Sequence, residues 1–252
     1  MPRILPPGGA VDWPADEGVL GVVGVAPWAT LDFARALYRQ VDASKDWHYP
    51  RLLLDINTKL PSRGRHLQLG ETDPSPAIAA TIEELARQGA TLAVVVCNTA
   101  HILFERWAAG SPIPLLHIIE ETTRHAGDCG ARNIAALASA SLAEHDLYGK
   151  SAGRRGIGST RIDATDQALV NRFIEAIKVS GKLDAEQLRD AGSLLVKLRA
   201  REVDTVVAGC TELSVLESTA REAGLRFVDS NAALARAALI RLGVSAEKLR
   251  PF

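Results

Sequence analysis

The sequence contains few of the residues that tie a fold together covalently or around a metal ion. Its 252 residues include only three cysteines, Cys97, Cys129 and Cys210, and no Cys-x-x-Cys pair. A disulfide framework needs several cysteines in a short secreted chain, and a structural zinc site needs clustered Cys and His residues. The sequence therefore predicts free thiols and no bound metal.

Neither sign of charge dominates, and long apolar runs are absent. Lys and Arg number 29 against 30 for Asp and Glu, so no net field attracts nucleic acid or an anionic membrane. No apolar stretch approaches the roughly 20 residues of a membrane-spanning helix. The N-terminal residues lack the apolar core of a signal peptide. These absences predict a cytoplasmic protein that acts on a small molecule.

What the chain does contain is an alternation of apolar runs and amphipathic segments. The strand-like runs are 19–26, 51–57, 92–97, 113–119, 133–139, 203–210 and 226–230. Helical periodicity falls at about 30–41, 77–88, 166–180, 185–200 and 231–243, with Ser75 as the expected N-cap of the second of these helices. Alternating strands and helices favour parallel sheets joined by right-handed crossovers, which is an α/β fold.

The two halves of the chain share a local pattern. LAVVVCNT (92–99) and DTVVAGCT (204–211) both end an apolar strand on a cysteine that short polar residues follow. Ligands of parallel sheets bind outside the carboxyl ends of the strands, where helix N-termini favour anions and lower the pKa of a thiol. One such cysteine is more often a small buried side chain. The matched pair instead predicts that Cys97 and Cys210 face a common carboxylate ligand, whereas Cys129 has no counterpart and no assigned role.

The residues around these two cysteines resemble the paired signatures of the aspartate/glutamate racemase family, whose members work without pyridoxal phosphate. The signatures are CNTAH (97–101) and GCTEL (209–213). Weaker similarities follow in family order: GVVGVAPWATLDF (21–33), NTKLPSR (57–63), ETDPSP (71–76), IPLLHIIEET (113–122) and LASAS (137–141). The resemblance covers the chain from about residue 19 onward, and His101 and Glu212 point to the aspartate racemase branch.

The resemblance implies two similar doubly wound α/β domains related by pseudo-twofold symmetry, with the active site in the cleft between them. The first domain would span 18–115 plus 229–252, because the C-terminal helix commonly returns to it, and the second would span 116–228. Residues 1–17 are expected to form an extended leader. The resemblance also implies a homodimer and no cofactor.

The implied reaction interconverts L and D amino acids, most directly aspartate or both aspartate and glutamate. Cys97 and Cys210 would act as thiolate base and thiol acid on opposite faces of Cα, and hydrogen bonds would stabilise the carbanionic intermediate. Arg63 is the candidate for the distal carboxylate, since a guanidinium binds a carboxylate in bidentate fashion. The full set of candidate substrate-binding residues is Asn57, Arg63, Asn98, Thr99, Ser139, Lys178 (or Lys182 close by), Thr211 and Glu212.

The turn after the first strand departs from the family pattern. Gly24 is followed by Val25, Ala26 and Pro27, one residue fewer than in the family's Gly-Gly-Met-Gly-Pro. That turn contacts substrate in the family, so the sequence leaves the choice of amino acid open. Three alternatives stand beside a racemase: a related isomerase or decarboxylase acting on a small dicarboxylate, a binding protein built on the same cleft, and nucleotide binding by GVVGVAP, a partial match to G-x-G-x-x-G.

Overall fold

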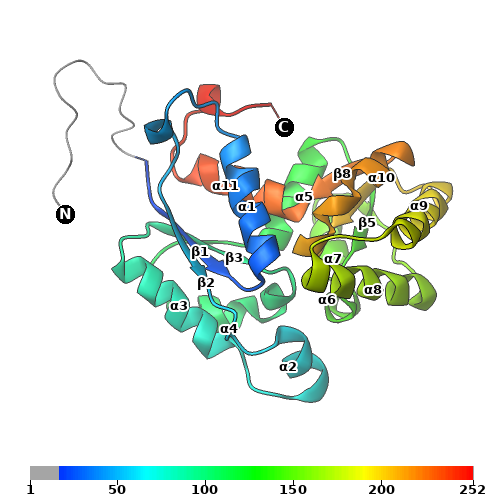
Figure 1. The fold of residues 1–252 in the computed structure, drawn as a ribbon, viewed down its shortest axis with the longest axis horizontal. Helices are drawn as coiled ribbons and strands as arrows, with labels where there is room; N and C mark the ends of the chain where they lie inside the picture. The colour runs from blue at the N-terminus through cyan, green and yellow to red at the C-terminus, as the bar shows by residue number, and fades with distance from the viewer. Residues whose placement is uncertain (1–16, 252) are drawn as a thin grey trace.

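The computed structural model of the protein describes residues 17–251 (Figure 1). Nearly all of the leader expected at 1–17 therefore lies outside the described residues. No helix in the described range is long and apolar enough to cross a membrane.

Two parallel sheets of four strands each form the framework of the described chain. The first has the order β2-β1-β3-β4 and the second the order β6-β5-β7-β8, so the same winding occurs twice. The predicted α/β class with two doubly wound parallel sheets is confirmed. The strands are β1 (Leu20–Gly24), β2 (Leu52–Ile56), β3 (Leu92–Val96), β4 (Leu115–Leu116), β5 (Asn133–Leu137), β6 (Gly158–Ser159), β7 (Thr205–Ala208) and β8 (Arg226–Asp229).

Helices connect the strands and cover the sheets. They are α1 (Pro27–Arg39), α2 (Arg63–Leu69), α3 (Ser75–Arg87), α4 (Phe104–Ala108), α5 (Ile118–Asp128), α6 (Ala140–His145), α7 (Leu147–Gly153), α8 (Ala164–Ser180), α9 (Ala185–Ala200), α10 (Glu217–Glu222) and α11 (Ser230–Arg241). Short 3-10 helices follow at η1 (Asp46–His48), η2 (Thr99–Leu103), η3 (Thr211–Leu216) and η4 (Ala246–Lys248).

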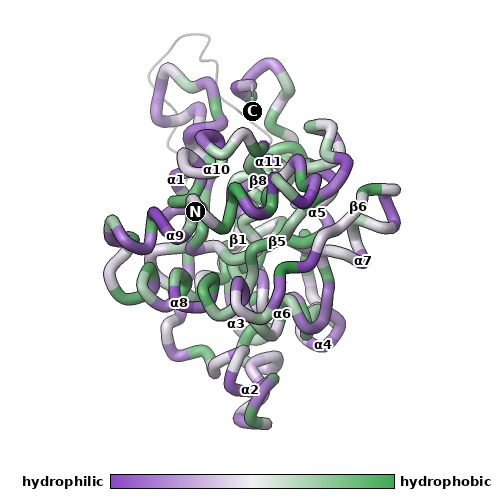
Figure 2. The backbone as a smooth tube through the Cα atoms, turned by 90° about the vertical axis from the view of Figure 1, so that its right-hand side faces the viewer, coloured by the Kyte–Doolittle hydropathy of each residue, from purple (hydrophilic) through white to green (hydrophobic). Residues whose placement is uncertain are grey.

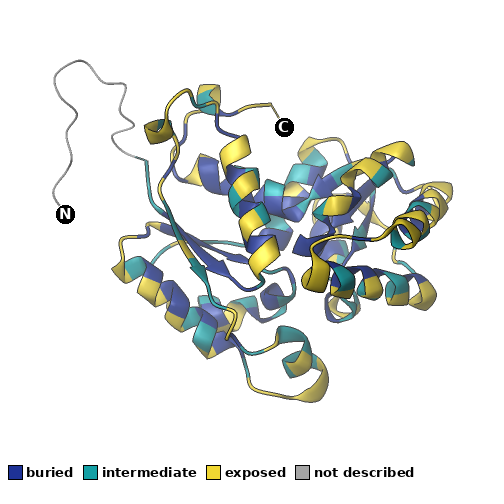
Figure 3. Cartoon of the chain, in the orientation of Figure 1, coloured by how far each residue is buried: buried dark blue, intermediate teal, exposed yellow. Residues whose placement is uncertain are grey.

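The hydrophobic pattern of each element matches its place in these layers. Every residue of β1 and β3 is buried, and Val22 lies opposite Val94 in their parallel register. Strands covered on both faces need such continuous apolar runs. The outer helix α8 buries one face only, through Val170, Phe173 and Ile177. Figure 2 accordingly shows hydrophobic colour along β1 and β5 and mixed colour along α8, and Figure 3 shows the exposed outer faces of α8 and α9.

The strand predicted at 113–119 is wrong for most of its length. Only Leu115–Leu116 pairs with β3, and α5 begins at Ile118. The hydroxyls of Thr122 and Thr123 donate to the carbonyls of Ile118 and Ile119, so these buried polar groups are satisfied inside the helix. A short apolar run does not distinguish a buried strand from the buried start of a helix.

The N-cap predicted for α3 is also wrong. The helix begins at Ser75 itself, and the Ser75 N–H donates to the Asp73 side chain at 2.8 Å. Ser75 therefore occupies the first turn, and Asp73 accepts from its backbone.

One hydrophobic cluster joins the two sheets. It contains Val22 and Val94 from the first sheet, Ile134 and Val207 from the second, and Leu234 from α11. Helix α11 packs against α1 and α5, and these three helices lie between the sheets in Figure 1. The division into 18–115 plus 229–252 and 116–228 stays a prediction, and the two parts so defined share this core.

Both sheets reverse their winding direction in the same way. In the first, β1 lies between β2 and β3, and in the second, β5 lies between β6 and β7. Open α/β sheets bind ligands beyond the carboxyl ends of the strands at such a reversal. The turns that follow β1, β3, β5 and β7 are therefore the places to search for a site.

Candidate active site

A cavity of about 300 Å³ lies at these turns, and both halves of the chain build its wall. Val25 and Ala26 follow β1, Cys97 follows β3, and Ser139 and Cys210 come from the turns after β5 and β7. Among the predicted site residues, those that line the cavity are Arg63, Cys97, Asn98, Thr99, Ser139, Lys178, Cys210, Thr211 and Glu212. Asn57 and Lys182 do not line it.

Cys97 lies at the end of β3 and is partly exposed toward the cavity. Its N–H donates back to the carbonyl of Val95, and the short helix η2 starts two residues later. His101 lies behind it, with Nδ1 2.9 Å from the Cys97 carbonyl oxygen. Burial, followed by the charge of His117, lowers the pKa of His101 to about 3. A neutral His101 therefore donates its Nδ1–H to this carbonyl and fixes the turn.

Cys210 is buried beside a carboxylate. Its Sγ donates to Oε2 of Glu212 at 2.9 Å, and the Thr211 hydroxyl donates to the same oxygen at 3.2 Å. Burial raises the pKa of the Cys210 thiol well above its ordinary value, and the negative charge of Glu212 raises it further. The ammonium of Lys178 acts in the opposite direction on this pKa. Cys210 is thus held as a protonated thiol with an acceptor at hand.

Two side-chain contacts join the two halves of the chain in the wall of the cavity. The Thr99 and Ser139 hydroxyls are 2.9 Å apart, and Gln68 of α2 donates to the Ser141 hydroxyl at 3.2 Å. In addition, the backbone N–H groups of Asn98 and Thr99 donate to no other protein group within residues 17–251. Hydroxyls and unpaired N–H groups on one wall are suited to hold a carboxylate.

Two side chains predicted to bind substrate instead form hydrogen bonds with other groups of the protein. The Asn98 side chain is buried, accepts from the Tyr148 hydroxyl and donates to Ser230, so only its backbone is available to a ligand. The Asn57 side chain accepts from the Lys59 N–H at 3.1 Å, outside the cavity wall.

Helix α8 supplies the outer wall, which the sequence reasoning identified only at Lys178. Asn171 and Glu175 line the cavity with it, at helical spacings of four and three residues. That spacing places all three on one helix face, so the periodicity around Lys178 was a signal that could have found them. Gln68 of α2 also lines the cavity and was missed.

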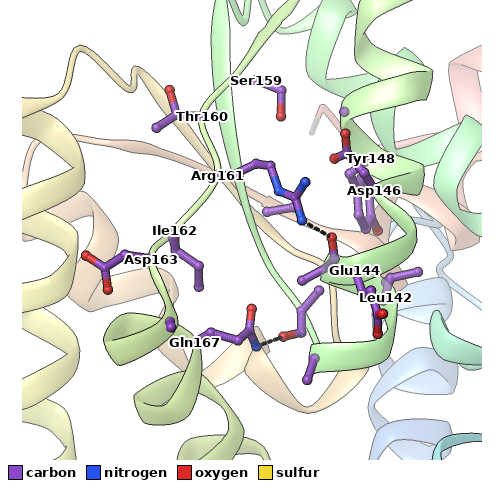
Figure 4. A pocket seen from close by; sticks show the side chains of 16 residues that line it. Leu142, Glu144, Asp146, Tyr148, Ser159, Thr160, Arg161, Ile162, Asp163 and Gln167 are labelled. Carbon is purple, nitrogen blue, oxygen red and sulfur yellow. Dashed lines mark hydrogen bonds between the residues drawn. The ribbon is translucent and has the colours of Figure 1, made fainter. Parts of the chain in front are cut away.

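A second cavity, of about 310 Å³, is shown in Figure 4. Ala140 belongs to the lining of both cavities. The second cavity is lined by α6, α7 and the segment before α8, and Arg161 reaches across it to the carbonyl of Ala143. It contains neither cysteine, so the paired thiols belong to the first cavity. Within residues 17–251, no group of three or more His, Cys, Asp or Glu side chains is arranged to hold a metal ion.

Comparison with known proteins identifies the family to which the chain belongs. The family model for Asp/Glu/hydantoin racemases matches residues 21–238, which is most of the chain. The protein is therefore a racemase, and so an isomerase. It belongs to the Asp/Glu/hydantoin racemase family, as an amino-acid racemase.

Individual relatives cover nearly the same range. The broad specificity amino-acid racemase RacX of Bacillus subtilis strain 168 is 26% identical over 207 residues, which is 82% of this chain and 86% of the relative. The Picrophilus torridus aspartate racemase has a TM-score of 0.79 at 25% identity, covering 93% of this chain and 96% of that one. An aspartate racemase homologue from Pyrococcus horikoshii OT3 shares the fold, with a TM-score of 0.68 at 18% identity over 89% and 99% of the two chains.

Proposed function

We propose that this racemase interconverts L- and D-aspartate, with Cys97 and Cys210 carrying the two protons. The observation that carries the proposal is that one cysteine from each half of the chain lines a single cavity. Racemisation removes a proton from one face of Cα and delivers another to the opposite face. It therefore needs two acid–base groups that face each other across the substrate.

In one direction Cys97 begins as a thiolate and takes the Cα proton, and the C–H electron pair stays behind as a carbanion. Cys210, which burial holds as a thiol, then gives its proton to the opposite face of Cα. Turnover leaves Cys97 as a thiol and Cys210 as a thiolate, which is the starting state for the other enantiomer. Proton exchange with solvent resets the pair.

The mechanism uses no electron-sink cofactor, so the protein itself must stabilise charge that develops on the α-carboxylate. The free N–H groups of Asn98 and Thr99 and the hydroxyls of Thr99 and Ser139 are the donors for this task. Arg63 and Lys178 on the outer wall would bind the distal carboxylate of aspartate. One Nη of Arg63 donates to the Pro61 carbonyl at 3.0 Å, which anchors the guanidinium.

A wider range of amino acids is the second candidate, and Glu175 favours it. This exposed carboxylate lines the cavity next to Lys178 and forms no ion pair with any described residue. A wall with both signs of charge accepts side chains that donate hydrogen bonds or carry a positive charge as well as carboxylates. The similarity to a broad specificity racemase supports the same reading.

The test is a panel of single L-amino acids incubated with the enzyme in heavy water without added pyridoxal phosphate. Aspartate is expected to take up α-deuterium and lose optical rotation. Exchange of neutral or basic amino acids in place of aspartate would favour the second candidate, and Glu175→Gln should then reduce exchange of the basic ones selectively. If no amino acid exchanges, the proposal is wrong, and release of carbon dioxide from a dicarboxylate would identify a decarboxylase instead.

Cysteine variants test the roles of the two sulfurs. Cys97→Ser and Cys210→Ser are each expected to lower the rate of racemisation at least about 100-fold, because each removes one acid–base group. Cys129→Ser, which changes an exposed cysteine outside the cavity, should keep full activity. Full activity in either of the first two variants would contradict the two-thiol mechanism. The homodimer also stays a prediction, which sedimentation of the same preparations would check.

A further inference from the structure

A buried polar network lies directly beneath the Cys97 turn. The Asn98 amide donates to the Ser230 hydroxyl at 2.9 Å and accepts from the Tyr148 hydroxyl at 2.6 Å. Asn98, Ser230 and Tyr148 are each at most 3% exposed. They come from three separated parts of the chain: the end of β3, the start of α11 and helix α7. Because Asn98 directly follows Cys97, this network sets where the Cys97 turn lies.

The residue after Ser230 reaches the other cysteine. Asn231 is fully buried, and its amide donates to the carbonyl of Thr211 at 3.4 Å and to that of Ala29 at 3.3 Å. Thr211 directly follows Cys210. The two neighbouring residues at the start of α11 therefore contact the two cysteine turns separately, Ser230 through Asn98 and Asn231 through Thr211.

Tyr148 touches both turns. Its hydroxyl bonds Asn98, while its ring packs against Gly209, the residue before Cys210. A Cβ added at Gly209 would lie 2.8 Å from Cε2 of this ring, closer than side chains tolerate. Figure 4 shows Tyr148 from the side of the neighbouring cavity, in whose wall it lies. The ring and the hydroxyl thus have separable contacts, and Tyr148→Phe removes only the second.

We infer that Tyr148, Ser230 and Asn231 are positioning residues, which hold the two thiols where they can reach opposite faces of the substrate's Cα. Tyr148 and Ser230 act on Cys97 through Asn98, and Asn231 acts on Cys210 through Thr211. The inference rests on the proposed two-thiol mechanism, in which both sulfurs must address the same carbon from opposite faces. A displacement of about 1 Å costs a reaction of this kind roughly 100-fold in rate.

These separate roles can be distinguished by enzyme kinetics. Racemisation has an equilibrium constant of one, so kcat/KM falls equally in both directions and cannot reveal which sulfur has moved. The α-deuterium isotope effect on kcat/KM does reveal which sulfur has moved. A higher barrier at Cys97 makes that proton transfer more rate-limiting, so the isotope effect rises for the enantiomer that Cys97 deprotonates and falls for the other.

The experiment compares Tyr148→Phe, Ser230→Ala and Asn231→Ala with the wild type, using α-deuterated L and D substrate. Tyr148→Phe and Ser230→Ala should each lower kcat/KM about 10- to 100-fold. Both variants should raise the isotope effect for the enantiomer that Cys97 deprotonates and lower it for the other enantiomer. Asn231→Ala should lower the first isotope effect and raise the second. If Asn231→Ala does not fold, Asn231→Ser replaces it. Isotope effects that stay unchanged, or that move together for both enantiomers, would overturn the inference.

Ser151→Ala is the matched control. Its hydroxyl bonds that of Thr123 at 2.6 Å in a buried contact on the same helix as Tyr148. It should lower the melting temperature without moving either isotope effect, which separates lost stability from lost positioning.

A second measurement needs no substrate. Mass spectrometry can follow the rate at which iodoacetamide alkylates each cysteine. Relative to Ser151→Ala, this rate should change at Cys97 in Tyr148→Phe and Ser230→Ala. In Asn231→Ala it should change at Cys210. A wild type that racemises no amino acid while its variants show this pattern rejects the proposed function alone. Unchanged alkylation in all three variants rejects the positioning roles.

Discussion

The two thiols differ in their immediate partners, and Glu212 makes the difference. Its carboxylate accepts from Cys210, whereas the Cys97 sulfur has no hydrogen-bond partner among the described residues. The Cys210 sulfur therefore has a buried hydrogen-bond acceptor beside it, whereas the Cys97 sulfur is partly open to the cavity. In the direction described above for the proposed mechanism, Cys210 starts as the acid and Cys97 as the base.

Replacing Glu212 by Gln tests this asymmetry. The variant removes the second-largest influence that raises the pKa of Cys210, so the thiol should titrate at lower pH than in the wild type. Thiolate absorbance in a background of Cys97→Ser and Cys129→Ser measures this directly. Racemisation, measured with both cysteines present, should fall about 10- to 1000-fold, because the carboxylate that assists proton transfer at Cys210 is lost. Glu175→Gln, which changes another carboxylate of the same cavity, should leave the titration of Cys210 unaltered.

At the residue scale the sequence could predict the chemistry but not the direction of each side chain. The repeated strand-cysteine-cap pattern located both thiols because parallel strands with the same winding bring their carboxyl ends together. Nothing in the local sequence distinguishes an Asn98 amide that faces a ligand from one that faces Tyr148 and Ser230. Those partners lie 50 and 132 residues away and meet Asn98 only in the folded chain.

At the scale of elements, α11 connects the second sheet to the first. Its N-cap is Asp229, whose carboxylate accepts from the Asn231 N–H at 2.8 Å. Burial raises the pKa of Asp229 to about 6, although the hydrogen bond from Asn231 acts against that shift. Ionising the Asp229 carboxyl group therefore costs free energy in the folded protein. This group caps the helix that contains Ser230 and Asn231.

Asp229→Asn should remove that cost and keep a capping oxygen. An acid whose pKa is raised from 3.8 to about 6 on folding binds more protons in the native state between those values. The free energy of unfolding therefore falls as pH rises through this window, by up to about 3 kcal/mol. Urea denaturation at pH 4 and pH 7 should show that the variant gains stability relative to the wild type as pH rises. A constant difference between the two proteins would contradict the raised pKa.

Apart from α5, whose apolar start was predicted as a strand, the helices that sequence reasoning missed share a physical cause. Helices α2, α6 and α7 have six or seven residues each, too few for a 3.6-residue period to stand out. Their ends are set by local contacts, as where Ser62 accepts from the Arg65 N–H and Ser139 from the Leu142 N–H. Helix α8, with 17 residues, repeats its period several times and was therefore predictable. Strand β3 was predictable although it is short, because all five of its residues are apolar and buried.

At the scale of the whole molecule, the repeat describes the winding of the sheets but not the packing between them. Both sheets have the same strand order, yet one hydrophobic cluster contains residues of each sheet together with α1, α5 and α11. Each sheet also has a hydrophobic cluster of its own. The C-terminal helix fills the space between the sheets and adds the shared cluster to these two.

The shared core predicts that the two halves unfold together. All four tryptophans precede residue 108, so tryptophan fluorescence reports on the first half, while far-UV circular dichroism reports on helices of both. Urea transitions followed by the two probes should coincide, as two-state unfolding requires. Leu234→Ala, which cuts a fully buried side chain of α11, should lower the free energy of unfolding by about 2–5 kcal/mol with both probes. Val179→Ala, at an exposed position on α8, is the control and should change stability little. Transitions that separate, or a Leu234→Ala effect confined to fluorescence, would show that the halves are independent units and that α11 belongs to the first alone.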